Sequence, residues 1–242
     1  VAVVGESGSG KSTLARVITG LLPPEQGTVA FKGNPLPSML SDRQKDELRS
    51  IQMIYQMPDV ALNPRQRVYE IIGRPLEFYL GLQGQEKSRR IQQLLQQIEL
   101  PESFVERYPA QLSGGEKQRI CIARALAAEP DLVICDEVTS ALDQLVAEGI
   151  LELLQSLQND LNLSYLFITH DLATVKAIAD DIVVMYQGRI VEQGGKHDIL
   201  TPPHEPYTEL LLSSVPEMDP DWLDDLMERR RRGVAPTADS IN

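Results

Sequence analysis

The segment GESGSGKST at residues 5–13 constrains this chain more than any other feature. It follows the apolar run Val1–Val4, which predicts a buried strand, and precedes a pattern that predicts a helix from about Lys11 to Leu21. The glycines allow a tight turn whose N–H groups, with the helix N-terminus, can hold phosphate oxygens. The Lys11 ammonium can reach the β- and γ-phosphates of a nucleotide, and the Ser12 hydroxyl can bind Mg²⁺. We therefore expect a phosphate-binding loop made of Gly5, Glu6, Ser7, Gly8, Ser9, Gly10, Lys11, Ser12 and Thr13.

The composition is that of an ordinary globular protein with an acidic surface. Apolar residues make up 42% and charged residues 24% of the 242 residues, and the formal net charge is −12. This charge lacks the basic footprint of a nucleic-acid-binding protein and disfavours electrostatic attachment to an anionic membrane. The longest apolar runs have the length of strands, far short of the roughly 20 residues of a membrane-spanning helix. Any membrane attachment is therefore expected to come through a protein partner.

The two cysteines, Cys121 and Cys135, both lie in apolar stretches. Their spacing does not fit a metal site or a redox pair. We therefore expect two reduced thiols in the core.

Strand-length apolar runs alternate with helical patterns along the chain, which favours a mostly parallel sheet covered by helices. Polar residues separate most of these runs. The expected strands are Val1–Val4, Thr28–Phe31, Ile51–Gln56, Leu132–Cys135 and Leu163–Ile168, followed by a hairpin of Ile182–Tyr186 and Arg189–Glu192 across Gln187 and Gly188.

The pattern between residues 60 and 126 is helical, with apolar residues at helical spacing between glutamines and arginines. Asp143 can cap a later helix whose buried face would carry Val146, Ile150, Leu153, Leu154 and Leu157. We therefore expect an α/β core of residues 1–58 and 127–215, an inserted helical subdomain at 59–126 and a tail at 216–242. The run Arg229–Arg232 in the tail is interpreted as solvated, with a docking patch as the alternative.

Two carboxylates, Asp136 and Glu137, follow directly after the predicted strand at 132–135. Ligands bind at the carboxyl ends of strands in open α/β sheets. Asp136 is expected to hold Mg²⁺ through water, and Glu137 to orient or deprotonate an attacking water. The alternative, a carboxylate pair that only caps the next helix, is disfavoured by the phosphate loop on the same chain.

The segment LSGGE at Leu112–Glu116 provides a second candidate anion site. A serine hydroxyl and bare backbone stand at the start of an amphipathic helix, where the helix dipole favours negative charge. Because Lys11 already serves the γ-phosphate of this chain, the second site suggests a nucleotide held by another chain. A capping box formed by Ser113 and Glu116 is the structural interpretation, and both can hold together.

Taken together, these motifs resemble those of ABC-transporter ATPases along nearly the whole chain. The motifs match in order. This resemblance implies the P-loop NTPase fold with an inserted helical signature subdomain. The matching motifs are the phosphate loop, Gln56 as the Q-loop glutamine, the signature Leu112–Glu116, the Walker B strand Leu132–Asp136 with Glu137, the D-loop Ser140–Asp143 and His170 as the switch histidine.

The resemblance implies that two such domains pair head-to-tail with two ATP molecules and Mg²⁺ between them. Gln56 would contact Mg²⁺ and the attacking water, and its loop would face a transmembrane permease. His170 would contact the γ-phosphate; the structural alternative is a strand-end residue that caps the next helix. The catalytic set is then Glu137, His170, Gln56 and Lys11. The residues acting on the partner's nucleotide are Ser113, Gly114, Gly115 and Asp143.

Softer signals resemble the oligopeptide and dipeptide import branch of the family. These are ALNPR at Ala61–Arg65 and PPHEPYT at Pro202–Thr208, although the branch more often has His-Pro-Tyr than Glu-Pro-Tyr. Glutathione and other small peptide-like solutes are equally compatible. Glu116 stands where glutamine is commoner, which should be tolerated because Ser113 and the glycines contact phosphate.

The resemblance also implies partners and a location. An importer ATPase would sit on the cytoplasmic face of the membrane, peripheral through permease subunits, and serve an extracytoplasmic solute-binding protein indirectly, with no nucleic acid. The family's adenine-stacking aromatic would precede Val1, so we interpret the chain as a fragment or the second cassette of a fused protein. The alternatives are an importer ATPase for a non-peptide solute, a soluble ABC ATPase acting on ribosomes or DNA, and a regulatory cassette that does not hydrolyse ATP. Intact Glu137 and His170 disfavour the regulatory cassette.

Overall fold

The computed structural model describes residues 1–213, so the predicted tail at 216–242 and the run Arg229–Arg232 lie outside the described residues. The chain divides into two compact units, one of residues 1–11 with the chain from residue 167 onward, and one of residues 12–166. Among residues 1–213, no helix combines the length and the apolar character needed to cross a bilayer.

The first unit is built on three parallel strands and one antiparallel strand. Strand β1 (Ala2–Val4) pairs in parallel with the end of β6 (Ser164–Thr169) on one side and with β7 (Asp181–Tyr186) on the other. Strand β8 (Arg189–Gly195) runs antiparallel to β7 across the turn at Gln187 and Gly188. The predicted hairpin is therefore confirmed, with β8 three residues longer than expected.

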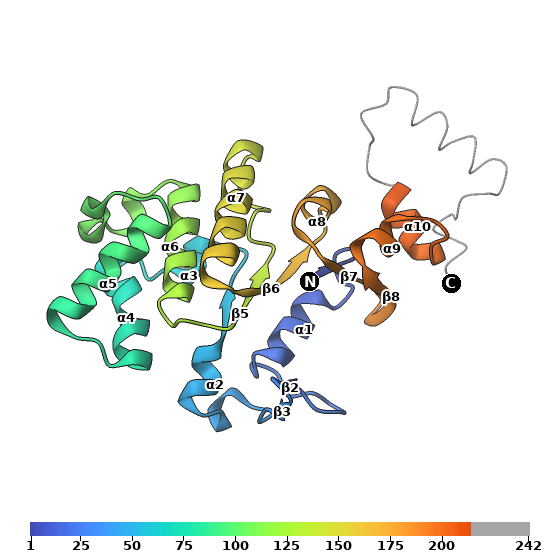
Figure 1. Cartoon of the computed structure of the whole chain (residues 1–242), viewed down its shortest axis with the longest axis horizontal. Coiled ribbons are helices and arrows are strands. Elements are labelled where there is room, and N and C mark those ends of the chain that lie inside the picture. The colour runs from blue at the N-terminus through green and yellow to red at the C-terminus, as the bar shows by residue number, and fades with distance from the viewer. Residues whose placement is uncertain (214–242) are drawn as a thin grey trace. The chain divides into compact units, whose positions relative to one another are not determined.

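Three short helices complete the first unit, namely α8 (Leu172–Ile178), α9 (Lys196–Leu200) and α10 (Pro206–Ser213). In Figure 1, α9 and α10 lie beside β8, and each of the two helices contacts this strand. The helix considered after His170 is α8, whereas no pattern predicts α9 and α10, because helices of five and eight residues have few turns in which to show an apolar period.

The second unit contains the parallel pair β4 (Ile51–Ile54) and β5 (Leu132–Asp136), in the register Ile51 to Leu132. Helix α7 (Gln144–Leu161) buries four residues of the predicted face, Ile150, Leu153, Leu154 and Leu157, whereas Val146, also predicted there, is only half-buried. Helix α1 (Lys11–Ile18) and the short hairpin of β2 (Ala30–Phe31) and β3 (Asn34–Pro35) precede this pair in the chain.

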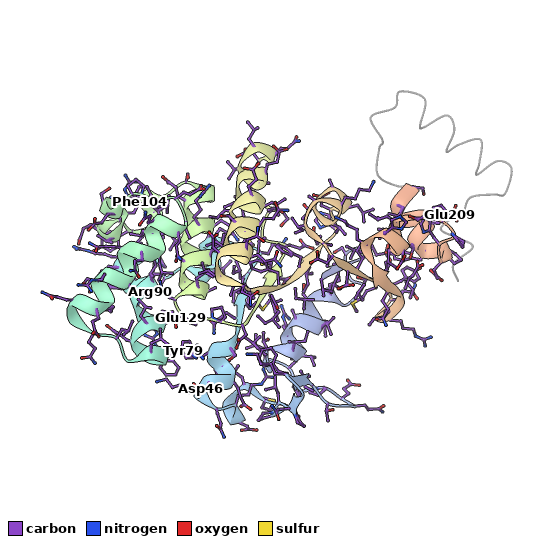
Figure 2. All side chains as sticks on the ribbon, in the orientation of Figure 1. Asp46, Tyr79, Arg90, Phe104, Glu129 and Glu209 are labelled. Carbon is purple, nitrogen blue, oxygen red and sulfur yellow. The ribbon has the colours of Figure 1, made fainter. Side chains whose placement is uncertain are left out.

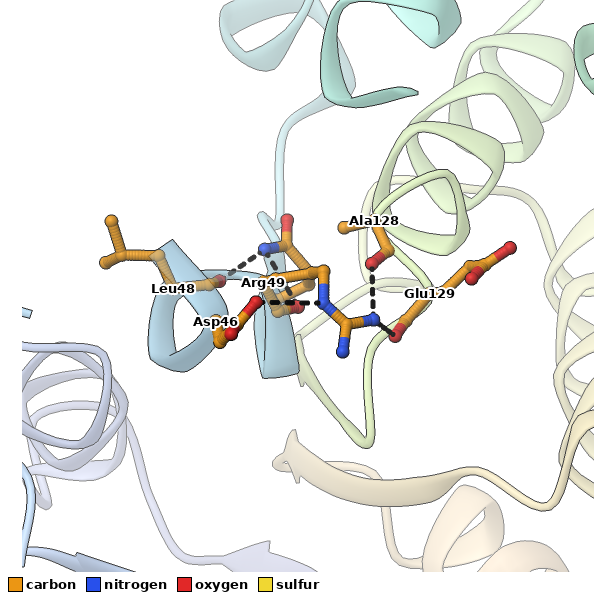
Figure 3. Close-up of polar contacts among 6 residues, drawn as sticks. Asp46, Leu48, Arg49, Ala128 and Glu129 are labelled. Carbon is orange, nitrogen blue, oxygen red and sulfur yellow. Dashed lines mark hydrogen bonds and ion pairs between the residues drawn. The ribbon is translucent and has the colours of Figure 1, made fainter. Parts of the chain in front are cut away.

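Arg49, in helix α2 (Lys45–Ser50), fixes the entry to β4. Its Nη1 donates to the carbonyls of Glu129 at 2.9 Å and Ala128 at 3.4 Å, and its Nε lies 3.9 Å from the Asp46 carboxylate (Figure 3). These carbonyls belong to the turn between α6 (Gly114–Leu126) and β5. One side chain therefore links the segments that lead into both parallel strands.

A cluster of helices forms the rest of the second unit, and this cluster contains the predicted signature segment. Helices α4 (Val68–Leu80), α5 (Gly84–Gln97) and α6 (Gly114–Leu126) pack against one another, as Figure 1 shows, with α3 (Pro58–Ala61) against α6. Two 3₁₀ turns, Glu102–Glu106 and Pro109–Gln111, lie between α5 and α6. At the edge of the cluster, Arg90 Nη2 lies 3.3 Å from the Glu129 carboxylate (Figure 2).

Several boundaries differ from expectation; β2, for example, begins at Ala30 instead of Thr28. Helix α1 ends at Ile18 instead of near Leu21, because Gly20 adopts a left-handed φ of 78° that terminates the helix. Strand β4 ends at Ile54, which leaves Tyr55 and Gln56 in the loop after it.

Candidate functional site

The phosphate loop turns directly out of β1 and into α1. Gly5 has a φ of 152°, and a Cβ built there would lie 2.1 Å from the Met185 carbonyl oxygen. No other residue therefore fits at the start of this turn. Gly10, with a φ of 103°, releases the chain into α1. Ser7 and Gly8 are exposed between them, and Thr13 is exposed on α1.

The Lys11 ammonium lies inside this turn and is buried. It donates to the carbonyls of Gly5 and Glu6, each at 2.8 Å, and lies 3.4 Å from Ser9 Oγ. A lysine has three N–H donors and no acceptor, so the loop carbonyls satisfy the charge. The loop is thus folded around a cation at the position where the sequence predicts phosphate binding.

Two contacts from distant parts of the first unit hold the loop from outside. The Gly188 N–H at the hairpin turn donates to the Ser9 carbonyl at 3.0 Å. The Glu6 N–H donates to the Tyr207 hydroxyl at 2.9 Å. The sequence predicts neither contact, because neither Gly188 nor Tyr207 belongs to a phosphate-binding pattern; Tyr207 lies in the segment Pro202–Thr208 that resembles the import branch.

His170 directly follows β6 and is exposed. The next residue, Asp171, caps α8 by accepting from the N–H groups of Ala173 at 2.9 Å and Thr174 at 3.2 Å. The capping function considered for His170 therefore belongs to Asp171. His170 remains a prediction as the γ-phosphate contact.

In the second unit, two of the three residues predicted to bind Mg²⁺, Ser12 and Asp136, meet. Ser12 Oγ donates to Asp136 Oδ1 at 3.1 Å, although 124 positions separate them in the chain. A hydroxyl and a carboxylate oxygen are ligands that suit a hard cation such as Mg²⁺. The residues present therefore fit this ion.

The two predicted water-orienting groups also lie together. Gln56 Nε2 donates to Glu137 Oε2 at 2.8 Å, and it lies 3.2 Å from Ser140 Oγ, which donates to the Glu137 carbonyl at 2.9 Å. Glu137 has a φ of 49°, a left-handed conformation that is uncommon for a residue with a side chain. The orientation of the Glu137 carboxylate is therefore set by its left-handed backbone conformation and by the hydrogen bond from the Gln56 amide.

The signature segment forms the predicted capping box at the start of α6. Ser113 Oγ accepts from the Glu116 N–H at 3.3 Å, and the Ser113 N–H donates to the Glu116 carboxylate at 2.7 Å. Asp143 caps α7 as expected, accepting from the Val146 N–H at 3.2 Å. A Cβ at Gly115 would lie 2.6 Å from Val146 Cγ1, a packing constraint that the motif did not reveal.

A groove of about 710 Å³ lies beside Gln56 in the second unit. Its lining includes Tyr55, Met57 and Val60, whose side chains are 42%, 55% and 78% exposed, and Tyr79 of α4 (Figure 2). Monomeric soluble proteins seldom expose such a cluster of large apolar side chains, so this is a candidate protein-binding surface.

Comparison with known sequences agrees with these motifs. A family model described as "ABC transporter" matches residues 1–140, and one described as "Oligopeptide/dipeptide transporter, C-terminal region" matches residues 191–240. The dipeptide transport ATP-binding protein DppF of Haemophilus influenzae is 41% identical over 221 residues, covering 91% of this chain and 68% of the relative. The oligopeptide transport ATP-binding protein OppF of Salmonella typhimurium is 46% identical over 220 residues, covering 90% and 66%.

Solved structures show the same fold. CbiO1 from Clostridium perfringens, part of the ABC transporter complex CbiONQ, superposes with a TM-score of 0.74 at 27% identity, covering 94% of this chain and 86% of that protein. The ATP-binding cassette MJ0796, in a dimeric post-hydrolysis state with ADP and phosphate, superposes with a TM-score of 0.67 at 31% identity, covering 80% and 84%. The predicted α/β P-loop fold is therefore confirmed.

The chain spans about two thirds of the length of these curated relatives. The family match covers more than half of the chain and contains the phosphate loop, Gln56, the signature segment and the Asp136–Glu137 pair. On this evidence, the chain belongs to the ABC transporter family of ATP-binding proteins.

Proposed function

We propose that this chain binds and hydrolyses ATP with Mg²⁺ to power a transporter that imports oligopeptides, dipeptides or related solutes. The observation that carries the ATPase part is the meeting of Ser12 with Asp136, beside the contact of Gln56 with Glu137 in the same unit. A bound Mg²⁺ would neutralise charge on the phosphates during in-line displacement. The peptide part rests on the printed names of the relatives and on the C-terminal family model.

The chain's own groups divide the work. Lys11 and the loop N–H groups bind the phosphates, where fixed donors stabilise charge that develops in the transition state. Ser12 and Asp136 hold the metal, directly or through water. Glu137 accepts a proton from the attacking water or orients it, and Gln56 holds that carboxylate in place before substrate arrives.

A second copy or a related cassette would complete each site. The capped N-terminus of α6 offers the Ser113 hydroxyl and the N–H groups of Gly114 and Gly115, which suit a γ-phosphate held by the partner chain. Asp143 would link the two sites. The dimeric state of the MJ0796 cassette supports this arrangement.

The groove beside Gln56 is our candidate surface for the permease. Its exposed apolar side chains suit an amphipathic segment of a membrane subunit, and docking there would place the ATPase on the cytoplasmic face of the membrane. Arg43 also lines the groove, and its buried Nη2 has no hydrogen-bond partner among residues 1–213. The permease segment is therefore expected to present a carboxylate or a carbonyl oxygen to Arg43.

The test of hydrolysis is Glu137→Gln. This change keeps the shape of the side chain and removes the proton acceptor, so turnover should fall at least about 100-fold while ATP binding persists. With ATP and Mg²⁺, the variant should also elute as a stable dimer in size-exclusion chromatography. Glu148→Gln, on the exposed face of α7, is the matched control and should behave as wild type. Retained turnover in Glu137→Gln would contradict its function as the base.

The test of permease docking is Val60→Asp. A charge in the exposed apolar lining should abolish co-purification with the permease subunits and leave the ATPase activity of the isolated protein unchanged. Undiminished co-purification would reject the groove as the docking surface.

A further inference from the structure

The C-terminal part of the first unit reaches into the phosphate loop through one side chain. The Tyr207 hydroxyl accepts a hydrogen bond from the Glu6 N–H at 2.9 Å, and 201 positions separate the two residues in the chain. Tyr207 lies in α10 and is only 4% exposed. An apolar residue could fill the same space, but only the phenol hydroxyl accepts a hydrogen bond from a backbone N–H of the phosphate loop. The contact therefore depends on the hydroxyl and not only on the bulk of the ring.

The backbone of Glu6 is hydrogen-bonded through both its N–H and its carbonyl. Its N–H donates to Tyr207, and the carbonyl of the same residue accepts from the Lys11 ammonium at 2.8 Å. On the other side of the loop, the Gly188 N–H holds the Ser9 carbonyl at 3.0 Å. Rotation of the chain at Glu6 would break the first two bonds, so Tyr207 resists a change in the shape of the loop.

Tyr207 is itself aimed by its neighbours. Its ring packs on Tyr186 at the end of β7, with centroids 4.2 Å apart and planes inclined by 32°. The Tyr207 N–H donates to the Glu205 carboxylate at 2.9 Å, and the Glu205 N–H donates to the Glu192 carboxylate on β8 at 3.2 Å. The hydroxyl is thus positioned by α10 and by the same hairpin that holds Ser9.

Burial supports a neutral phenol at this position. Desolvation raises the pKa of Tyr207, and the hydrogen bond from Glu6 opposes this only in part. The hydroxyl therefore remains protonated at physiological pH, and the contact does not depend on an ionised tyrosine.

We propose that Tyr207 is a positioning residue for ATP binding, which holds the Glu6 peptide so that the phosphate loop is preformed before nucleotide arrives. This inference rests on the proposed ATPase function. It assigns a function in the nucleotide site to the C-terminal segment. A preformed loop lowers the ordering cost of binding, so loss of the hydroxyl should weaken nucleotide binding and leave the chemical step intact.

The experiment compares Tyr207→Phe with Tyr186→Phe in the purified protein. The first removes the hydroxyl that meets Glu6 and keeps the ring stack. The second removes a hydroxyl that accepts from Gln187 Nε2 at 3.1 Å, outside the loop. With N-methylanthraniloyl-ATP and Mg²⁺, Tyr207→Phe should bind about three- to tenfold more weakly, and its KM for ATP should rise by the same factor with kcat within about twofold. Tyr186→Phe should match wild type.

Hydrogen exchange provides a readout without nucleotide. In Tyr207→Phe, the peptide that contains Glu6 should exchange faster than in wild type or Tyr186→Phe, because the N–H has lost its partner. A lower melting temperature with unchanged KM and unchanged exchange at Glu6 would assign Tyr207 a purely structural function and overturn the inference. Failure of the wild-type protein to bind the nucleotide probe would overturn the proposed function instead.

Discussion

Replacing Gly115 by alanine should destabilise the contact between α6 and α7, whereas the same change at the neighbouring Gly114 should not. A Cβ at Gly115 would lie 2.6 Å from Val146 Cγ1, closer than side-chain carbons approach one another. At Gly114, the nearest atom is Leu142 Cδ2 at 3.5 Å, an ordinary van der Waals contact. The two glycines are adjacent in the first turn of α6, so they form a matched pair.

The expected magnitude follows from the stiffness of the clashing group. Valine in a helix has one strongly preferred χ1 rotamer, so Val146 cannot rotate freely and the helices must shift instead. Overpacking of this kind costs about 1–3 kcal/mol, and the gain in helix propensity from Gly to Ala offsets at most about 1 kcal/mol. We expect Gly115→Ala to lose about 1–2 kcal/mol of unfolding free energy, a fall in Tm of about 2–8 °C for a chain of this size. Gly114→Ala has no clash to offset this propensity gain, so it should be as stable as wild type or up to about 1 kcal/mol more stable.

The assay is urea and thermal unfolding without nucleotide, followed by circular dichroism. The double variant Gly115→Ala with Val146→Ala should recover much of the loss, because removing the two Val146 methyl groups removes the clash. Equal stability of Gly115→Ala and Gly114→Ala, or additive losses in the double variant, would refute the reasoning. Confirmation would mean that Gly115 is required by packing as well as by its predicted contact with a partner's phosphate.

Two further experiments test other parts of the structure. Asp171→Ala should cost about 1–2 kcal/mol of unfolding free energy, since the carboxylate accepts from the N–H groups of Ala173 and Thr174 at the start of α8, and Asp171→Asn should restore most of it in the same urea titration. Cys121 and Cys135 are free and buried, as predicted, and burial raises the pKa of Cys121 to about 11 and that of Cys135 further. Iodoacetamide at pH 8.5 should therefore alkylate both thiols only in urea. The free energy of unfolding should fall as the pH rises from about 8.5 towards 11, because in that range the thiols lose their protons only in the unfolded state. Rapid alkylation of the folded protein would contradict the burial of the two cysteines.

The predictions that succeeded depend on residues close together in the chain. The turn from β1 into α1 follows from the glycines around Lys11, and the capping box at Ser113 follows from a glutamate three positions later. The buried face of α7 follows from apolar spacing. In each case the backbone conformation is local, so the side chains that take part can be identified from their spacing alone.

The predictions that failed or were never made have two causes: a local signal too short or too weak to recognise, or packing between distant segments. Helices α9 and α10 are too short to show a period, and the end of α1 at Ile18 depends on the left-handed conformation of Gly20. The need for glycine at position 115 depends on α7, which begins about 30 positions later.

The sequence by itself determined the family, the phosphate loop and the identity of the candidate metal and water ligands, because these are carried by residue types at fixed local spacing. Only the tertiary structure decided that Ser12 meets Asp136, that Gln56 binds Glu137, and that Tyr207 accepts a hydrogen bond from Glu6 in the phosphate loop. The physical reason is that hydrogen bonds between remote segments require the strands and helices to pack first. Nothing in the sequence around Tyr207 indicates which backbone N–H its hydroxyl will reach.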